Sequence, residues 1–161
     1  MGVISFIKNA GAKIFGIGKT DAEIAQEALE KELKEEALVA RRLETTIRDL
    51  NLHVEDLNIQ IDDDLATICG MAYDQATREK VILVVGNNEG IANVDDQMTV
   101  EHVEPEAQFH TVVSGDTLGK IAKKFYGNAM KYPVIFEANK PMLKDPDLIY
   151  PGQVLRIPNL D

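Results

Sequence analysis

The sequence of 161 residues contains one cysteine, no tryptophan and no long apolar run. A single cysteine, Cys69, excludes an internal disulfide framework and a zinc site built from several cysteines. No stretch approaches the roughly 18 apolar residues that a membrane-spanning helix needs. The formal net charge of −10 disfavours nucleic acid and anionic membrane surfaces as partners, because both repel an acidic protein.

Proline is missing from the first 104 residues, and all six prolines lie after them. The same 104 residues hold 21 acidic against 10 basic side chains, whereas residues 105–161 hold 6 against 7. Six of the nine aromatic residues also lie in the second part. Since Pro105 cannot continue a regular ladder, we place a domain boundary beside it. We predict an N-terminal segment over 1–20 and two domains, 21–104 and 105–161.

The segment 1–20 combines apolar residues with three lysines and no acidic side chain. On a helix, one apolar face would be formed by Val3, Phe6, Ile7, Ala10, Ile14 and Phe15. Lys8 and Asn9 interrupt the apolar run, and neither a signal-peptide cleavage site nor a myristoylation pattern is present. We expect a cytoplasmic protein with an N-terminal amphipathic helix, which either docks on its own protein or anchors it at a membrane surface.

Helical and then alternating patterns follow in the first predicted domain. Apolar residues recur at helical spacing over 21–51, and the many glutamates between them indicate a solvated face. Alternation over 57–61 and 65–71, on either side of an aspartate-rich turn, predicts a hairpin. Residues 74–86 begin with a capping Asp and end with Gly, which predicts a second helix, and 94–101 reads as a further strand.

This α-β-β-α-β order is typical of a small α+β fold with helices on one face of a sheet. Together with Gly70 inside the second strand, it resembles the BON domain family over residues 34–103. The resemblance implies that this part of the chain has no catalytic residues and that it binds membranes or small ligands.

The second predicted domain has a β-α-α-β pattern over residues 109–158. Its signatures are V-x-S-G-D-T-L from Val112, A-N-K from Ala138 and I-Y-P-G-Q-V-L-R-I-P from Ile149. Ser114 or Asp116 is positioned to cap the first helix, and Gly127 to end it. These residues resemble the LysM domain family, whose members bind N-acetylglucosamine glycans such as peptidoglycan or chitin. The resemblance implies a groove formed by Gly115, Asp116, Thr117, Leu118, Asp147, Leu148, Ile149 and Tyr150.

Nearly the whole chain resembles the small bacterial cytoplasmic potassium-binding proteins of BON–LysM architecture, although the helical segment 21–40 is longer than that resemblance implies. The resemblance implies one K⁺ ion held by main-chain carbonyls of Ile7, Ala10, Ala12, Gly86, Asn88 and Ile91. Carbonyls at a helix end lack internal partners and lie at the negative end of the helix dipole, which suits a weakly hydrated cation. Ordinary helix-capping loops are the other interpretation of the same glycines.

No set of residues in the sequence is arranged for catalysis. The three histidines are scattered without the spacing of a zinc site, and the aspartate pairs lack the pattern of an EF-hand. We therefore expect a non-enzymatic, monomeric K⁺ sensor or buffer whose conformation is linked to the ion. The alternatives are a peptidoglycan-binding protein of the cell envelope and a membrane-associated scaffold.

Overall fold

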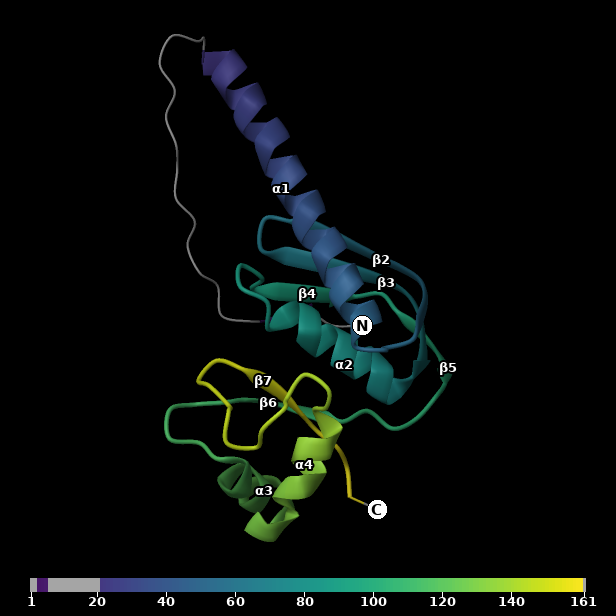
Figure 1. The fold of residues 1–161 in the computed structure, drawn as a ribbon, viewed down its shortest axis with the longest axis vertical. Helices are drawn as coiled ribbons and strands as arrows, with labels where there is room; N and C mark the ends of the chain where they lie inside the picture. Colours follow the sequence, from purple (N-terminus) through teal and green to yellow (C-terminus); the bar gives the residue numbers. More distant parts are fainter. Residues whose placement is uncertain (1–2, 6–20, 161) are drawn as a thin grey trace.

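The computed structural model describes residues 3–5 and 21–160, and its elements form two sheets with helices (Figure 1). The first group of elements is β1 (Val3–Ser5), α1 (Asp21–Asp49), β2 (Val54–Asp62), β3 (Leu65–Asp74), α2 (Gln75–Gly86), β4 (Asn93–Asp96) and β5 (Thr99–His102). The second is β6 (Gln108–Thr111), α3 (Leu118–Tyr126), a 3₁₀ helix (Ala129–Lys131), α4 (Tyr132–Ala138) and β7 (Val154–Ile157). We call these groups the large unit and the small unit. The α+β fold class is as predicted.

The sheet of the large unit has the strand order β1-β4-β3-β2, with β5 also paired to β3. β2 and β3 form the predicted antiparallel hairpin, whereas β4 and β5 both run parallel to β3. β1 pairs antiparallel with β4 at the edge of the sheet. Pro105 lies between the last strand of this sheet and the first strand of the small unit.

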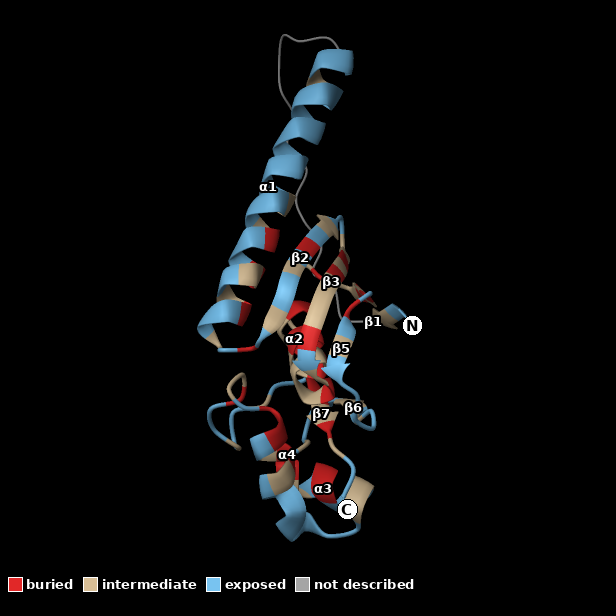
Figure 2. Ribbon diagram, turned by 90° about the vertical axis from the view of Figure 1, so that its right-hand side faces the viewer, coloured by how far each residue is buried: buried red, intermediate tan, exposed pale blue. Residues whose placement is uncertain are grey.

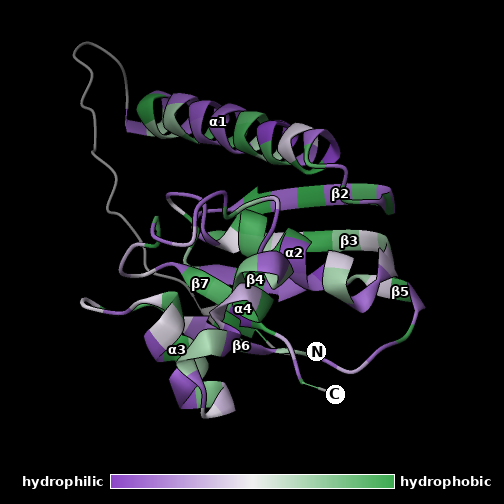
Figure 3. Cartoon of the chain, turned by 60° about the horizontal axis from the view of Figure 1, so that its bottom comes forward, coloured by the Kyte–Doolittle hydropathy of each residue, from purple (hydrophilic) through white to green (hydrophobic). Residues whose placement is uncertain are grey.

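Helix α1 is continuous, and only its second half packs on the sheet. Ala40, Leu43 and Ile47 are buried in one core with residues of α2 and of the sheet strands. Burial of a Leu or Ile side chain contributes about 1.5–3 kcal/mol, so this half anchors the helix. The first half projects beyond the sheet and is exposed (Figure 2). Apolar positions nevertheless recur along the whole of α1 (Figure 3).

The structure corrects the helix predicted over the first residues. Val3–Ser5 form a strand, with Val3, Ile4 and Ser5 opposite Asp95, Val94 and Asn93. The edge of β4 offers unpaired backbone groups, and the β-branched side chains of Val3 and Ile4 favour an extended chain. The remainder of that prediction, over 6–20, lies outside the described residues.

The strand predicted over 94–101 is two strands rather than one. The ladder is interrupted at Gln97 and Met98, between β4 and β5. The Asp96 carboxylate accepts a hydrogen bond from the Met98 N–H at 3.0 Å and pairs with Arg78 at 2.7 Å. A side chain that bonds the backbone two residues ahead forms a local turn, which replaces the sheet pairing there.

The small unit has the predicted β-α-α-β order around a core of its own. β6 and β7 pair antiparallel, and α3 and α4 pack over them. Leu118, Ile121 and Ile135 of the helices are buried against residues of β7. Gly127 ends α3 in the left-handed conformation, as predicted, with its N–H bonded to the Lys123 carbonyl.

Gly70 accommodates a bulge in the neighbouring strand. The register of β2 and β3 shifts between Glu55 and Asn58, opposite Gly70. Gly70 has a φ of +137°, and a Cβ there would lie 2.8 Å from the Glu55 carbonyl oxygen and 2.7 Å from the side chain of Val54. Both the backbone conformation and the close approach of β2 therefore require glycine.

We expect Gly70→Ala to lower the free energy of unfolding by at least about 2 kcal/mol, because it adds backbone strain and a clash. Gly119→Ala in α3 is the control, since a Cβ there meets no atom closer than 3.8 Å. Urea unfolding of the two variants measures the difference. Equal midpoints for both would contradict the role assigned to Gly70.

Candidate functional site

The last residue of α2 and the loop after it contain three of the residues expected to bind K⁺, namely Gly86, Asn88 and Ile91. Asn87 caps α2 through its N–H, which bonds the Leu83 carbonyl at 2.9 Å. The Asn88 N–H bonds the Val85 carbonyl at 3.1 Å, and the Asn88 carbonyl accepts a bond of 3.3 Å from Ile91. The loop is therefore held close to the helix end.

The end of α2 carries negative partial charge that no basic side chain of its last turn offsets. Gly86 and Ile91 are buried, and Asn88 is half-buried. The Asn88 side chain bonds the neighbouring Glu89 carbonyl, so it is turned back on its own loop. The buried main chain at Gly86 and Ile91 offers neutral carbonyl oxygens to a cation. Ile7, Ala10 and Ala12, the other three expected ligands, lie outside the described residues.

Three parts of the chain meet at the start of β4. Ser5 of β1 lies opposite Asn93, two residues after Ile91. The Asp64 carbonyl, in the β2–β3 turn, accepts hydrogen bonds from Ala92 at 2.8 Å and from Asn93 at 3.0 Å. The end of β1, the end of the loop after α2 and the β2–β3 turn therefore lie together.

The side chain of Asn87 links the large unit to the small unit. Its Nδ2 donates to the Val154 carbonyl at 2.9 Å, and its Oδ1 accepts from the Val154 N–H at 2.8 Å. Asn87 therefore completes both backbone bonds of a buried residue in β7. No pattern in the sequence identifies Asn87 as a link between the units. An amide at a helix C-terminus signals a cap but does not reveal a partner 67 positions away.

A buried carboxylate makes a second link between the two units. Glu79 of α2 is 2% exposed and accepts bonds from the Ala107 N–H at 3.0 and 3.2 Å. Arg156 Nε of β7 lies 3.2 Å from the same carboxylate, and Gln75 Nε2 lies 3.3 Å from it. The charge of Glu79 is thus paired and fully hydrogen-bonded, as a buried carboxylate must be.

The first four residues of the expected glycan groove have clear structural roles. Gly115 turns the chain with a φ of +88°, and Leu118 is buried in the core. Thr117 caps α3 by accepting from the Lys120 N–H at 3.1 Å, so the predicted cap at Ser114 or Asp116 is wrong. Asp116 instead lies 2.9 Å from His110 Nε2. That contact, and then the Val113 N–H, hold the pKa of Asp116 below its usual range.

The other four expected groove residues lie in the loop before β7. Asp147 is exposed and Ile149 half-buried, whereas Leu148 and Tyr150 are 69% and 49% exposed. Leu148 and Tyr150 line a cavity of about 520 Å³ together with Asn87 and Asn88. None of the residues 115–118 lines that cavity. The structure therefore brings Leu148 and Tyr150 to the loop after α2.

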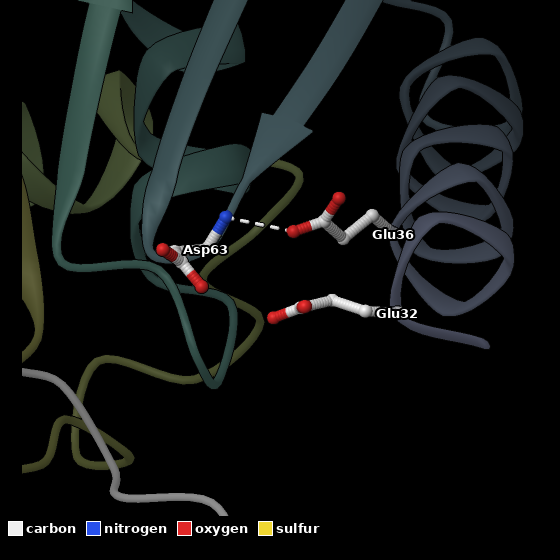
Figure 4. Close-up of side chains that lie close together, drawn as sticks. All are labelled: Glu32, Glu36 and Asp63. Carbon is white, nitrogen blue, oxygen red and sulfur yellow. Dashed lines mark hydrogen bonds between the residues drawn. The ribbon is translucent and has the colours of Figure 1, made fainter. Parts of the chain in front are cut away.

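An acidic cluster lies where α1 passes the β2–β3 turn (Figure 4). Carboxylate oxygens of Glu32, Glu36 and Asp63 lie within 4.8 Å of one another, and Glu36 accepts the Asp63 N–H at 2.7 Å. From the sequence we expected these glutamates to form a solvated face, because no spacing places the turn at Asp63 beside the helix. Repulsion from the Asp63 carboxylate is the main cause that holds the pKa of Glu32 above its usual range.

We expect Asn87→Ala to lower the free energy of unfolding by about 1–3 kcal/mol, because it leaves two buried backbone groups of Val154 without their partner. Asn88→Ala is the matched control, since its side chain bonds only an exposed carbonyl of its own loop. Thermal unfolding followed by circular dichroism measures both. Equal stability of the two variants would contradict the link.

We expect Glu32→Gln to raise the melting temperature at neutral pH and low salt, because it removes a repelled charge. A carboxyl whose pKa is raised in the folded state contributes stability at low pH that is lost as the pH rises through that pKa. The gain should therefore disappear as the pH falls below the pKa of Glu32. Glu30→Gln is the control on the same helix, and an equal gain in it would assign the effect to net charge.

None of the described helices combines the length and apolar character needed to cross a bilayer. The family model of the LysM domain matches residues 110–158, which include the whole β-α-α-β core of the small unit. Potassium binding protein Kbp of Escherichia coli O6:H1 is 47% identical over 159 residues, which cover 98% of this chain and 99% of that protein.

Two shorter similarities cover small parts of larger proteins. An uncharacterized protein of Deinococcus radiodurans is 51% identical over 49 residues, 30% of this chain and 19% of that protein. An esterase of Mycobacterium tuberculosis is 46% identical over 55 residues, 34% of this chain and 12% of the esterase. Such short matches do not carry an esterase activity to this chain. By its match over almost the full length of both proteins, the chain belongs to the family of potassium binding protein Kbp.

Proposed function

We propose that this protein binds one K⁺ ion through main-chain carbonyls of Ile7, Ala10, Ala12, Gly86, Asn88 and Ile91. The full-length relative is named as a potassium-binding protein, which supports the choice of ion. The residues come from two segments, the first after β1 and the second after α2. The proposal therefore requires that these two segments meet.

The pairing of β1 with β4 is the observation that carries the proposal. Ser5 lies opposite Asn93, and Ile7 and Ile91 are each two residues away from that pair. Consecutive Cα atoms are about 3.8 Å apart, so only a short length of chain separates each proposed ligand from the paired residues. If the antiparallel register continues, Ile7 comes directly opposite Ile91.

The chemistry of the loop after α2 suits a large monovalent cation. Carbonyl oxygens at the end of α2 carry partial negative charge, with no basic side chain in the last turn. Neutral oxygen ligands replace the hydration shell of K⁺, and their number and field strength select it over Na⁺. The acidic surface of the large unit attracts cations of any kind but does not select among them.

We further propose that the protein acts as a cytoplasmic K⁺ sensor or buffer. Asn87 stands between two of the proposed ligands and bonds the LysM domain at Val154. An ion that orders Gly86 and Asn88 also constrains the backbone of Asn87 between them. Because the Asn87 side chain bonds Val154, this constraint extends to the position of β7 relative to α2. Ion binding would thereby shift the population of domain arrangements.

Titration calorimetry with K⁺ and Na⁺ on the full chain tests the proposal, together with amide NMR. We expect heat and saturable shifts in residues 7–12 and 86–91 with K⁺, and much weaker effects with Na⁺. The melting temperature should rise more in KCl than in equal NaCl, because binding to the folded state stabilises it by mass action. Equal rises in the two salts, or shifts confined to other residues, would overturn the proposal.

Gly90→Ala tests the loop itself. Gly90 has a φ of +92° and open space around it, so an alanine adds backbone strain without a clash. Strain of about 1–2 kcal/mol favours a relaxed, ion-free loop and should weaken K⁺ binding about tenfold. Gly115→Ala is the matched control, with a φ of +88° and equally open space in the LysM domain. Asn88→Ala should retain full affinity, because the proposed ligand there is a main-chain oxygen.

A second function is favoured by the LysM match over 110–158. In this function, the LysM domain binds N-acetylglucosamine glycans through the accessible residues 115–117 and 147–150, and Leu118 supports the first loop from the core. Leu148 and Tyr150 supply exposed apolar surface for a sugar face. Sedimentation with insoluble chitin or peptidoglycan measures this binding, and its absence would leave only the ion-binding function.

A further inference from the structure

The first half of α1 carries an apolar stripe that nothing covers among the described residues. At 100° per residue, Leu29 and Leu33 lie about 20° and 60° from the mean direction of the buried residues Leu43 and Ile47. They therefore continue the core-facing side of the helix beyond the sheet, yet they are 55% and 56% exposed. Leu38 is similarly exposed, at 58%, but points to the opposite side of the helix.

The surface around this stripe is strongly acidic. Residues 21–38 carry seven acidic side chains against two lysines. Glu32 and Glu36 lie along one side of the stripe and form the cluster with Asp63 (Figure 4). Mutual repulsion in that cluster is relieved by a cationic partner, whereas a second copy of the same acidic surface would add to it.

One basic segment of the chain is covalently attached at both ends close to this surface. Residues 6–20 join Ser5 to Asp21. Ser5 pairs with Asn93, whose N–H bonds Asp64, and the next residue of that turn, Asp63, bonds Glu36. Asp21 is the far tip of α1, about 22 Å from Glu36 along the helix. The two residues that flank segment 6–20 are therefore fixed near opposite ends of the exposed half of α1.

The composition of segment 6–20 matches this surface. Its charged residues are Lys8, Lys13 and Lys19, with no acidic residue among them, and its large apolar residues are Phe6, Ile7, Ile14, Phe15 and Ile17. We propose that segment 6–20 docks on the stripe formed by Leu29 and Leu33, with its lysines beside the glutamates of α1. Covalent attachment at both ends keeps its effective concentration high, which favours this occupant over any separate molecule.

Hydrogen exchange of residues 6–20, measured by mass spectrometry on the full chain, tests the docking. We expect protection in the wild type and at least tenfold faster exchange in Leu29→Gln/Leu33→Gln. Leu38→Gln is the control, with the same change at an equally exposed leucine on the other side, and should exchange like the wild type. Equal exchange in the three proteins overturns the proposal. All three are expected to fold, because the substituted side chains are exposed.

Zero-length carbodiimide cross-linking identifies the occupant. In an equal mixture of unlabelled and ¹⁵N-labelled protein, we expect Lys8, Lys13 or Lys19 to link to glutamates of α1 within one chain. Links between labelled and unlabelled chains would place a second copy on the stripe, and the absence of any link from these lysines to α1 would leave the stripe without segment 6–20. Either result overturns the proposal.

The proposed docking of segment 6–20 on α1 does not depend on K⁺ binding. The exchange comparison is therefore made in potassium-free and in potassium-containing buffer, and the faster exchange of the double variant is expected in both. Calorimetry with K⁺ reports separately on the ion site, so failure of one proposal is distinguishable from failure of the other.

Discussion

The pairing of three residues of β1 with β4 is the constraint on which the rest of the arrangement depends. Asn93 lies opposite both Ser5 of β1 and Leu65 of β3, and its N–H bonds the turn at Asp64. The contacts of Asn93 therefore bring together β1, the end of the loop after α2 and the β2–β3 turn. The turn in turn meets α1 through Glu36. Both the proposed ion site and the proposed docking of segment 6–20 start from this point.

The junction between the two units is made of directional polar contacts. Asn87 pairs with both backbone groups of Val154, and Glu79 bonds Ala107 and Arg156. Each bond contributes only about 0.5–1.5 kcal/mol net, but leaving a buried partner unpaired costs more. Such directional bonds are satisfied in few relative orientations of the two units. That property suits a protein whose domain arrangement reports on an ion in the adjacent loop.

The acidic charge of the molecule has two separate effects. The carboxylates of Glu32, Glu36 and Asp63 are close enough to repel one another, and they lie at the surface where water screens them. They raise the local concentration of cations but bind none of them strongly by exposure alone. The end of α2 differs, because its main-chain oxygens are neutral and Gly86 is buried. A site of neutral carbonyl oxygens can select one ion, whereas the exposed carboxylates attract cations in general.

Local patterns in the sequence determined most of the secondary structure. Residues 74–86 have start and stop signals in their own sequence, so α2 was predictable, as were the β2–β3 hairpin and the turn at Gly127. The helix expected at Val3–Ser5 was wrong, because an edge strand is decided by its partner β4. The division of the strand over 94–101 depends on an Asp96 side chain whose partner, Arg78, is 18 residues away.

The tertiary structure alone decided which distant residues meet. Asn87 and Val154, Glu36 and Asp63, and Ser5 and Asn93 are pairs that no spacing in the sequence reveals. Periodicity reports which face of an element is apolar, but it holds no information on the position of that face relative to another element. The sequence therefore determined the elements and the family, whereas packing of the finished chain decided which backbone oxygens and carboxylates share a site.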